Sequence, residues 1–90
     1  MNVGNFYMTK HAAGRALDML VTVEEIRTAL VRPEVVYGQS NYGDRCSIRQ
    51  AGRIALALKG DMVMSVLYRK TEQWSRDDIA MAIRDAMEAA

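Results

Sequence analysis

Period-two alternation of apolar and polar residues runs through residues 44–69, DRCSIRQAGRIALALKGDMVMSVLYR, and it indicates antiparallel strands joined by short turns. Gly60 and Asp61 fit a two-residue hairpin turn. Met62–Leu67 is apolar at successive positions, which suits a strand in the middle of the sheet or one that is covered on both faces. Together with a shorter strand upstream, the expected strands are Glu34–Tyr37, Asp44–Arg49, Arg53–Lys59 and Met62–Arg69.

The loop before the Arg53–Lys59 strand decides which residues share a face of the sheet. A three-residue loop, Gln50–Gly52, places Arg49 opposite Arg53 and Ile48 opposite Ile54, so that apolar residues pair with apolar ones. A two-residue loop would place Arg49 opposite Ile54 and mix the faces. We therefore expect two faces of opposite character: Arg45, Arg49 and Arg53 on one, and Cys46, Ile48, Ile54 and Leu56 on the other.

Helical spacing of apolar residues precedes and follows these strands. Thr9 can cap a first helix over Lys10–Leu20, and residues 1–8 suit a frayed or edge strand. Threonine followed three residues later by glutamate, Thr22–Glu25, is a capping box for a second helix, which Pro33 should end. The short link between these helices favours a tight αα-hairpin.

The last helix should follow Ser75–Asp78, which resembles a capping box, and should extend over residues 75–89. The sequence therefore predicts an α+β fold: two N-terminal helices packed on a three- to four-stranded antiparallel sheet, with an additional C-terminal helix. A chain of 90 residues suits a single domain over 1–90, because a second hydrophobic core would not fit.

Composition excludes several classes of function. The chain carries 12 Lys and Arg residues against 11 Asp and Glu, so its net charge of +1 identifies no partner. One histidine and one cysteine exclude the usual zinc sites, and no glycine-rich phosphate loop is present, so we expect no metal and no cofactor. With a single cysteine, no apolar leader and no long apolar run, we expect no membrane contact and a cytoplasmic location.

Two constellations can carry chemistry. His11 and Arg15 lie four residues apart in the first helix, where a proton-transferring imidazole and a guanidinium would act together on a phosphodiester. The alternative is a solvated helix face. The second constellation is basic: Arg45, Arg49 and Arg53 on the sheet, with Arg69 and Lys70 at the end of the last strand.

Like charges on facing strands repel, so this arginine ladder needs a compensating anion. RNA phosphate is one candidate, and Glu and Asp side chains from the helices are the other. Tyr68 or Tyr42 would add a stacking surface or a proton donor.

The His-Ala-x-x-Arg helix, followed by TVEEIRTALVRPEVV and then strands, resembles a family of small bacterial and phage domains without an assigned function. The resemblance covers residues 9–69, and that family is similar to the RelE and BrnT type ribonuclease toxins. It implies two helices against a curved antiparallel sheet on which RNA is bound and cleaved without a metal, with an antitoxin as a further partner.

Carried over, the resemblance implies catalytic roles for His11, Arg15, Arg49 and Tyr68, and RNA contacts from Arg45, Arg53, Arg69 and Lys70. The chain departs from such toxins in having no second histidine and in ending with a helix. That helix can cover the sheet, mediate a homodimer or bind a partner. The alternative function is therefore a non-enzymatic phage or bacterial protein that binds a host protein.

Overall fold

The computed structural model describes residues 2–38 and 45–89 as an α+β structure. Its helices are α1 (Lys10–Asp18), α2 (Val23–Val31) and α3 (Arg76–Glu88). Its strands are β1 (Asn2–Val3), β2 (Phe6–Met8), β3 (Val35–Tyr37), β4 (Cys46–Ala51), β5 (Ile54–Lys59) and β6 (Met62–Tyr68). Tyr42, proposed above as a stacking residue, lies outside the described residues.

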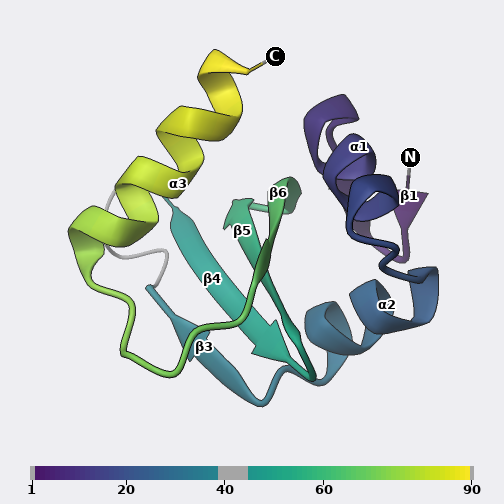
Figure 1. Cartoon of the computed structure of the whole chain (residues 1–90), viewed down its shortest axis with the longest axis horizontal. Helices are drawn as coiled ribbons and strands as arrows, with labels where there is room; N and C mark the ends of the chain where they lie inside the picture. The colour runs from purple at the N-terminus through teal and green to yellow at the C-terminus, as the bar shows by residue number, and fades with distance from the viewer. Residues whose placement is uncertain (1, 39–44, 90) are drawn as a thin grey trace.

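The strands of the described residues form one sheet in the order β1-β2-β6-β5-β4-β3, with α1 and α2 on one face and α3 on the other (Figure 1). The expected antiparallel sheet of three or four strands is wrong, because this sheet has six strands and β2 runs parallel to β6, with Tyr7 opposite Met62. Since β6 is covered on both faces, as predicted, its second edge needs hydrogen-bond partners. The N-terminal segment supplies these partners. Because the two segments lie far apart in the chain, the local alternation of polar and apolar residues does not predict their pairing.

The turn between β4 and β5 is Gly52–Arg53, and it corrects the predicted register. Ala51 pairs with Ile54 and Arg49 with Leu56, so the expected Arg49–Arg53 pair does not form. As expected, a glycine occupies the left-handed position: Gly52, the first residue of the turn, has φ +58. A positive φ at the first turn residue alone is the pattern of a type II′ turn. This turn matches the twist of the strands and therefore decides the register.

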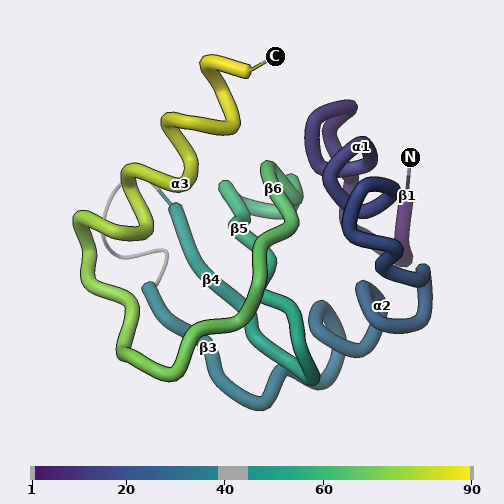
Figure 2. The backbone as a smooth tube through the Cα atoms, in the orientation of Figure 1, coloured from purple at the N-terminus to yellow at the C-terminus, as the bar shows by residue number. Residues whose placement is uncertain are grey.

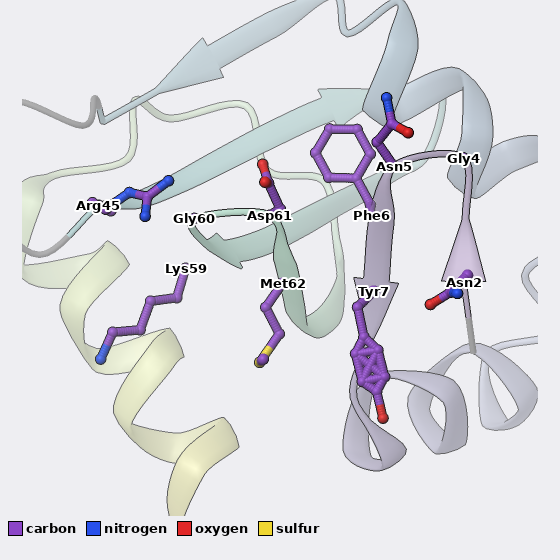
Figure 3. A pocket seen from close by; sticks show the side chains of 10 residues that line it. All are labelled: Asn2, Gly4, Asn5, Phe6, Tyr7, Arg45, Lys59, Gly60, Asp61 and Met62. Carbon is purple, nitrogen blue, oxygen red and sulfur yellow. The ribbon is translucent and has the colours of Figure 1, made fainter.

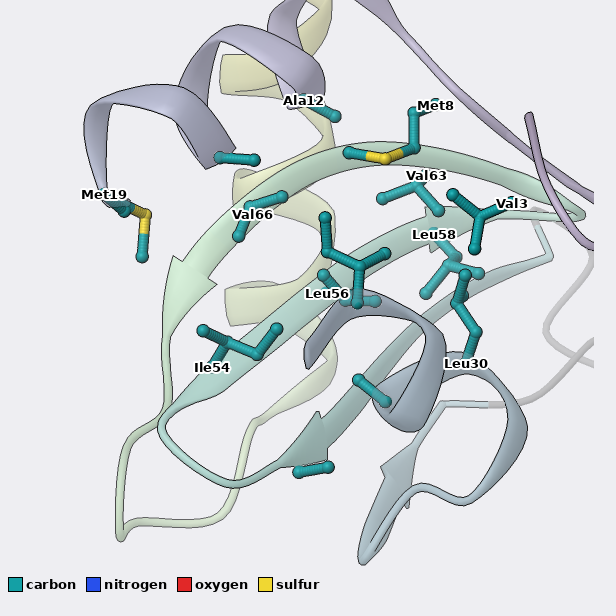
Figure 4. Packing of buried hydrophobic residues seen from close by; sticks show 14 residues of the cluster. Val3, Met8, Ala12, Met19, Leu30, Ile54, Leu56, Leu58, Val63 and Val66 are labelled. Atoms are coloured by element: carbon teal, nitrogen blue, oxygen red, sulfur yellow. The ribbon is translucent and has the colours of Figure 1, made fainter. Parts of the chain in front are cut away.

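Because of that register, the two predicted faces of the sheet are also wrong. Cys46 and Ile48 pack with α3, whereas Ile54 and Leu56 pack beneath α1 and α2. Figure 4 shows the second group from close by. Helices cover both faces, so polar and apolar alternation along these strands does not separate a buried face from an exposed one.

All three helices begin where the sequence predicted. Thr9 accepts a hydrogen bond from the Ala12 amide, and capping boxes at Thr22 and Ser75 start α2 and α3. The expected tight αα-hairpin is replaced by separate docking: α1 packs on β6 and β2, and α2 packs on β4 and β5 (Figure 2). Each helix buries its apolar face against the sheet rather than against the other helix.

Candidate functional site

Arg53, predicted to contact RNA, joins the turn before β5 to both N-terminal helices. Its guanidinium donates to the Glu25 carboxylate from Nε at 2.8 Å and to the carbonyl of Leu20, two residues after α1, at 2.9 Å. The hydrogen bonding of Glu25 with Arg53 lowers the pKa of Glu25 from 4.5 to about 2, with the Thr22 amide contributing next. Arg53 therefore has a structural role as a bridge between helices and sheet.

Arg69 and Lys70 are also paired with acids. Arg69 Nη1 lies 3.0 Å from the Glu34 carboxylate, and Lys70 Nζ lies 2.9 Å from Asp78. The Lys70 ammonium also lies 4.3 Å from the centre of the Trp74 ring. For these residues the compensating anions are Glu and Asp side chains rather than RNA phosphate, because carboxylates from a helix and a loop supply the charge.

His11 and Arg15 both lie against the edge of β6. Arg15 Nε donates to the Val66 carbonyl at 3.1 Å, and His11 Nε2 lies 3.4 Å from the hydroxyl of the buried Ser65. Thr9 Oγ1 adds a bond to the Met64 carbonyl at 3.2 Å. Beyond the short β2, side chains of α1 thus take the place of a neighbouring strand and protect the β6 edge.

The four residues assigned to catalysis come from three elements: His11 and Arg15 from α1, Arg49 from β4 and Tyr68 from β6. Tyr68 ends β6 and pairs with Ile54, while Lys59 and Met62 pair at the other end of the same hairpin. Five residue steps of a strand span roughly 17 Å, so Tyr68 lies far from the Gly60–Asp61 turn. Arg49 lies on β4 and packs over the Phe6 ring at 5.1 Å, while His11 and Arg15 face the edge of β6.

One end of the sheet carries cations that the described acids do not neutralise. Arg45 and Lys59 form no ion pair or side-chain hydrogen bond within residues 2–38 and 45–89, and both line a hollow of about 490 Å³ with Phe6 and Tyr7 (Figure 3). A second hollow of about 380 Å³ is lined by Arg45, Arg49 and Ser47. We call this region, around the Gly60–Asp61 turn that borders both hollows, the turn surface.

The backbone of the turn surface is held from two sides. The Gly60 amide donates to the Arg45 carbonyl at 3.0 Å, and the Tyr7 amide donates to the Asp61 carbonyl at 3.0 Å. Arg45 has φ +58, a left-handed conformation that is uncommon for a residue other than glycine. Non-glycine residues in this conformation cluster at functional sites, and here the strained residue carries a charge that no described residue pairs.

Arg49 is the most constrained cation of the turn surface. Its Nη1 donates to the Leu30 carbonyl at the end of α2, its guanidinium packs over Phe6, and its buried Nε has no partner among the described residues. Fixed in this way, Arg49 presents a charge of defined position to the smaller hollow.

Sequence reasoning found Arg45 and Arg49 but missed Lys59, Phe6, Tyr7 and Asp61 as site residues. The stretch from Arg45 to Lys59 holds four basic residues and no acidic one, which was a signal for Lys59. Phe6 and Tyr7 join the site through the parallel pairing of β2 with β6, whereas Asp61 lies in the predicted hairpin turn itself.

Within the described residues, no cluster of three His, Cys, Asp or Glu side chains is suited to a metal ion. Over the same residues, no helix has the length and apolarity needed to cross a bilayer. Comparisons with protein-family models, curated proteins and solved structures find no match to this chain.

Proposed function

We propose that the protein binds single-stranded RNA at the turn surface. The observation that carries the proposal is the set of cations, Arg45, Arg49 and Lys59, that no described carboxylate neutralises and that surround two adjoining hollows. Guanidinium and ammonium groups bind phosphate through charge-assisted hydrogen bonds. An unpaired cluster of this kind keeps its affinity for an external anion.

An aromatic side chain on the same side of the strands as Lys59 favours RNA over a simple anion. Tyr7 is 46% exposed, and Figure 3 shows its ring on the same side of the strands as Lys59. Bases stack on such rings when they are unpaired, while nearby cations hold the phosphates. The net charge of +1 gives little general attraction, so affinity should depend on these few contacts.

The geometry supports binding better than cleavage. Cleavage of RNA needs an acid, a base and a group that stabilises the charged phosphorane, all within reach of one phosphate. His11 and Arg15 bind the edge of β6, and Tyr68 ends that strand far from the Gly60–Asp61 turn. The toxin-type ribonuclease activity implied by the resemblance would require a different set of residues from the one proposed.

Fluorescence anisotropy with a labelled single-stranded RNA of about ten nucleotides, measured over a range of salt concentrations, tests the proposal. Each phosphate contact contributes about −0.7 to the slope of log K against log salt. Combined Arg45→Ala and Lys59→Ala substitutions should weaken binding and make the slope shallower by about 1.4. Arg27→Ala on α2 removes the same type of charge from an exposed pair with Glu24 and is the matched control.

Two results would contradict RNA binding at the turn surface. One is the absence of measurable binding at low salt. The other is equal weakening by Arg27→Ala and by the combined Arg45 and Lys59 substitutions, which would indicate a diffuse charge effect. Incubation of the RNA with the unmodified protein, followed by electrophoresis, tests cleavage separately.

Binding of a host protein or an antitoxin is a second candidate function, favoured by apolar side chains exposed on α3. Met81 is 58% exposed and Met87 is 52% exposed, and methionine suits adaptable protein contacts. Substitution of both by glutamate leaves the buried face of α3 intact. Capture of a partner from bacterial lysate should then be lost, and unchanged capture would contradict this role for α3.

A further inference from the structure

The turn surface carries one acidic side chain among its cations. Asp61 borders both hollows, and no other Asp or Glu among the described residues lines either of them. Its carboxylate makes no hydrogen bond or ion pair with the described residues, although Arg45 borders the same two hollows. Because a carboxylate repels phosphate, its presence here weakens binding of the RNA backbone unless it contacts another part of the nucleotide.

The position of Asp61 is well defined. It is the second residue of the two-residue turn between β5 and β6, and the bonds from Gly60 to Arg45 and from Tyr7 to Asp61 hold the turn on both sides. Figure 3 shows its carboxylate on the same side of the strands as the Phe6 ring, whereas Lys59, Met62 and Tyr7 project to the other side. An aromatic edge and the Arg45 guanidinium therefore flank the carboxylate.

The hydrogen-bond donors on each base determine how well that base can bind such a carboxylate. An ionised carboxylate only accepts hydrogen bonds, so it pairs best with two adjacent donors. On its Watson–Crick edge guanine presents a ring N–H beside an amino group. Adenine and cytosine present an amino group beside an acceptor nitrogen, and uracil presents one N–H between two carbonyls. Arginine planes and aromatic rings also stack on bases that are splayed out of a strand.

We propose that Asp61 selects guanine in single-stranded RNA, with its carboxylate accepting from the ring N–H and the amino group. The base lies on the Phe6 side of the turn, where the Arg45 guanidinium stacks against it. Lys59 and Arg49 hold the flanking phosphates. This inference rests on the proposed RNA binding and adds a base specificity to that same site.

Anisotropy measurements with uridine-rich oligomers that differ at one central position test the selection. Guanosine at that position should bind about tenfold more tightly than adenosine, cytidine or uridine. Inosine, which lacks the amino group, should fall between them. Asp61→Asn should remove the preference for guanosine and strengthen binding of the all-uridine oligomer, because a repulsive charge is lost.

Two further variants make the result decisive. Asparagine is favoured in hairpin turns, so Asp61→Asn should keep the fold, which its melting temperature checks. Asp77→Asn, in the first turn of α3, removes the same charge from a residue that lines neither hollow and should keep the preference. Equal affinity for all central bases, or a preference that persists in Asp61→Asn, overturns the guanine inference. Absence of binding to every oligomer instead overturns the RNA-binding proposal.

Discussion

Replacing Trp74 with phenylalanine removes the indole N–H that binds the buried amide of Gln50. Gln50 is 1% exposed, and Trp74 Nε1 lies 2.7 Å from its Oε1. The other bond to that oxygen, from the Lys70 amide, is long at 3.4 Å. Trp74→Phe therefore leaves a buried acceptor poorly satisfied, which costs about 1–3 kcal/mol of unfolding free energy.

A double-mutant cycle isolates this contact from the loss of ring area. Gln50→Leu removes the buried polar group, so Trp74→Phe in that background loses no hydrogen bond and costs only packing. The coupling energy between the two positions should be about 1–2 kcal/mol. For a domain of this size, each kcal/mol lowers the melting temperature by about 4–8 °C.

Urea denaturation followed by far-ultraviolet circular dichroism provides the four free energies. Trp74 is the only tryptophan of the chain, so fluorescence would not serve for its variants. A coupling below about 0.5 kcal/mol, within the usual additivity error, would refute the view that Gln50 anchors the segment leading to α3.

Three further outcomes follow from the structure. Pairing with Arg53 lowers the pKa of Glu25 to about 2, so the stability contributed by Glu25 is complete above pH 4.5 and is lost as the pH falls toward 2. Urea midpoints measured at several pH values should show a smaller loss of stability over this range in Arg53→Met than in the unmodified protein. Leu20 is 82% exposed at φ +56, so Leu20→Gly should raise stability by about 0.5–1 kcal/mol, and a lower melting temperature would contradict the strain argument. Arg15→Met removes the hydrogen bond to the Val66 carbonyl and should lower the free energy of unfolding by about 1 kcal/mol. It should also increase self-association through the uncovered β6 edge, which sedimentation velocity measures. A monomer of unchanged stability would contradict the edge-protecting role.

Arginine accounts for much of the difference between the expected and the observed site. A ladder of arginines was expected on one sheet face, and the structure instead gives each arginine its own surroundings. Arg53 bonds to Glu25, 28 positions away, and Arg69 bonds to Glu34, 35 positions away. Arg45 and Lys59 remain unpaired within the described residues. Which cations stay available for a ligand depends on such distant pairings, and single-residue patterns do not encode them.

Local chemistry accounts for what the sequence by itself determined. The caps at Thr9, Thr22 and Ser75 and the turn at Gly60–Asp61 each depend on residues within a few positions of one another, so they were predicted where the structure has them. The capping bonds close over three residues, and the glycine accepts the left-handed conformation that its turn requires. These features placed the helices and one hairpin.

Only the tertiary structure decided how those elements meet. The parallel pairing of β2 with β6, the burial of Gln50 and the approach of Phe6 to Arg49 all join segments that are far apart in the chain. Helices on both faces of the sheet bury polar and apolar positions alike, so alternation alone does not reveal the register. The same packing places the hairpin turn at Gly60–Asp61 beside Tyr7 and Arg45 and forms the turn surface there.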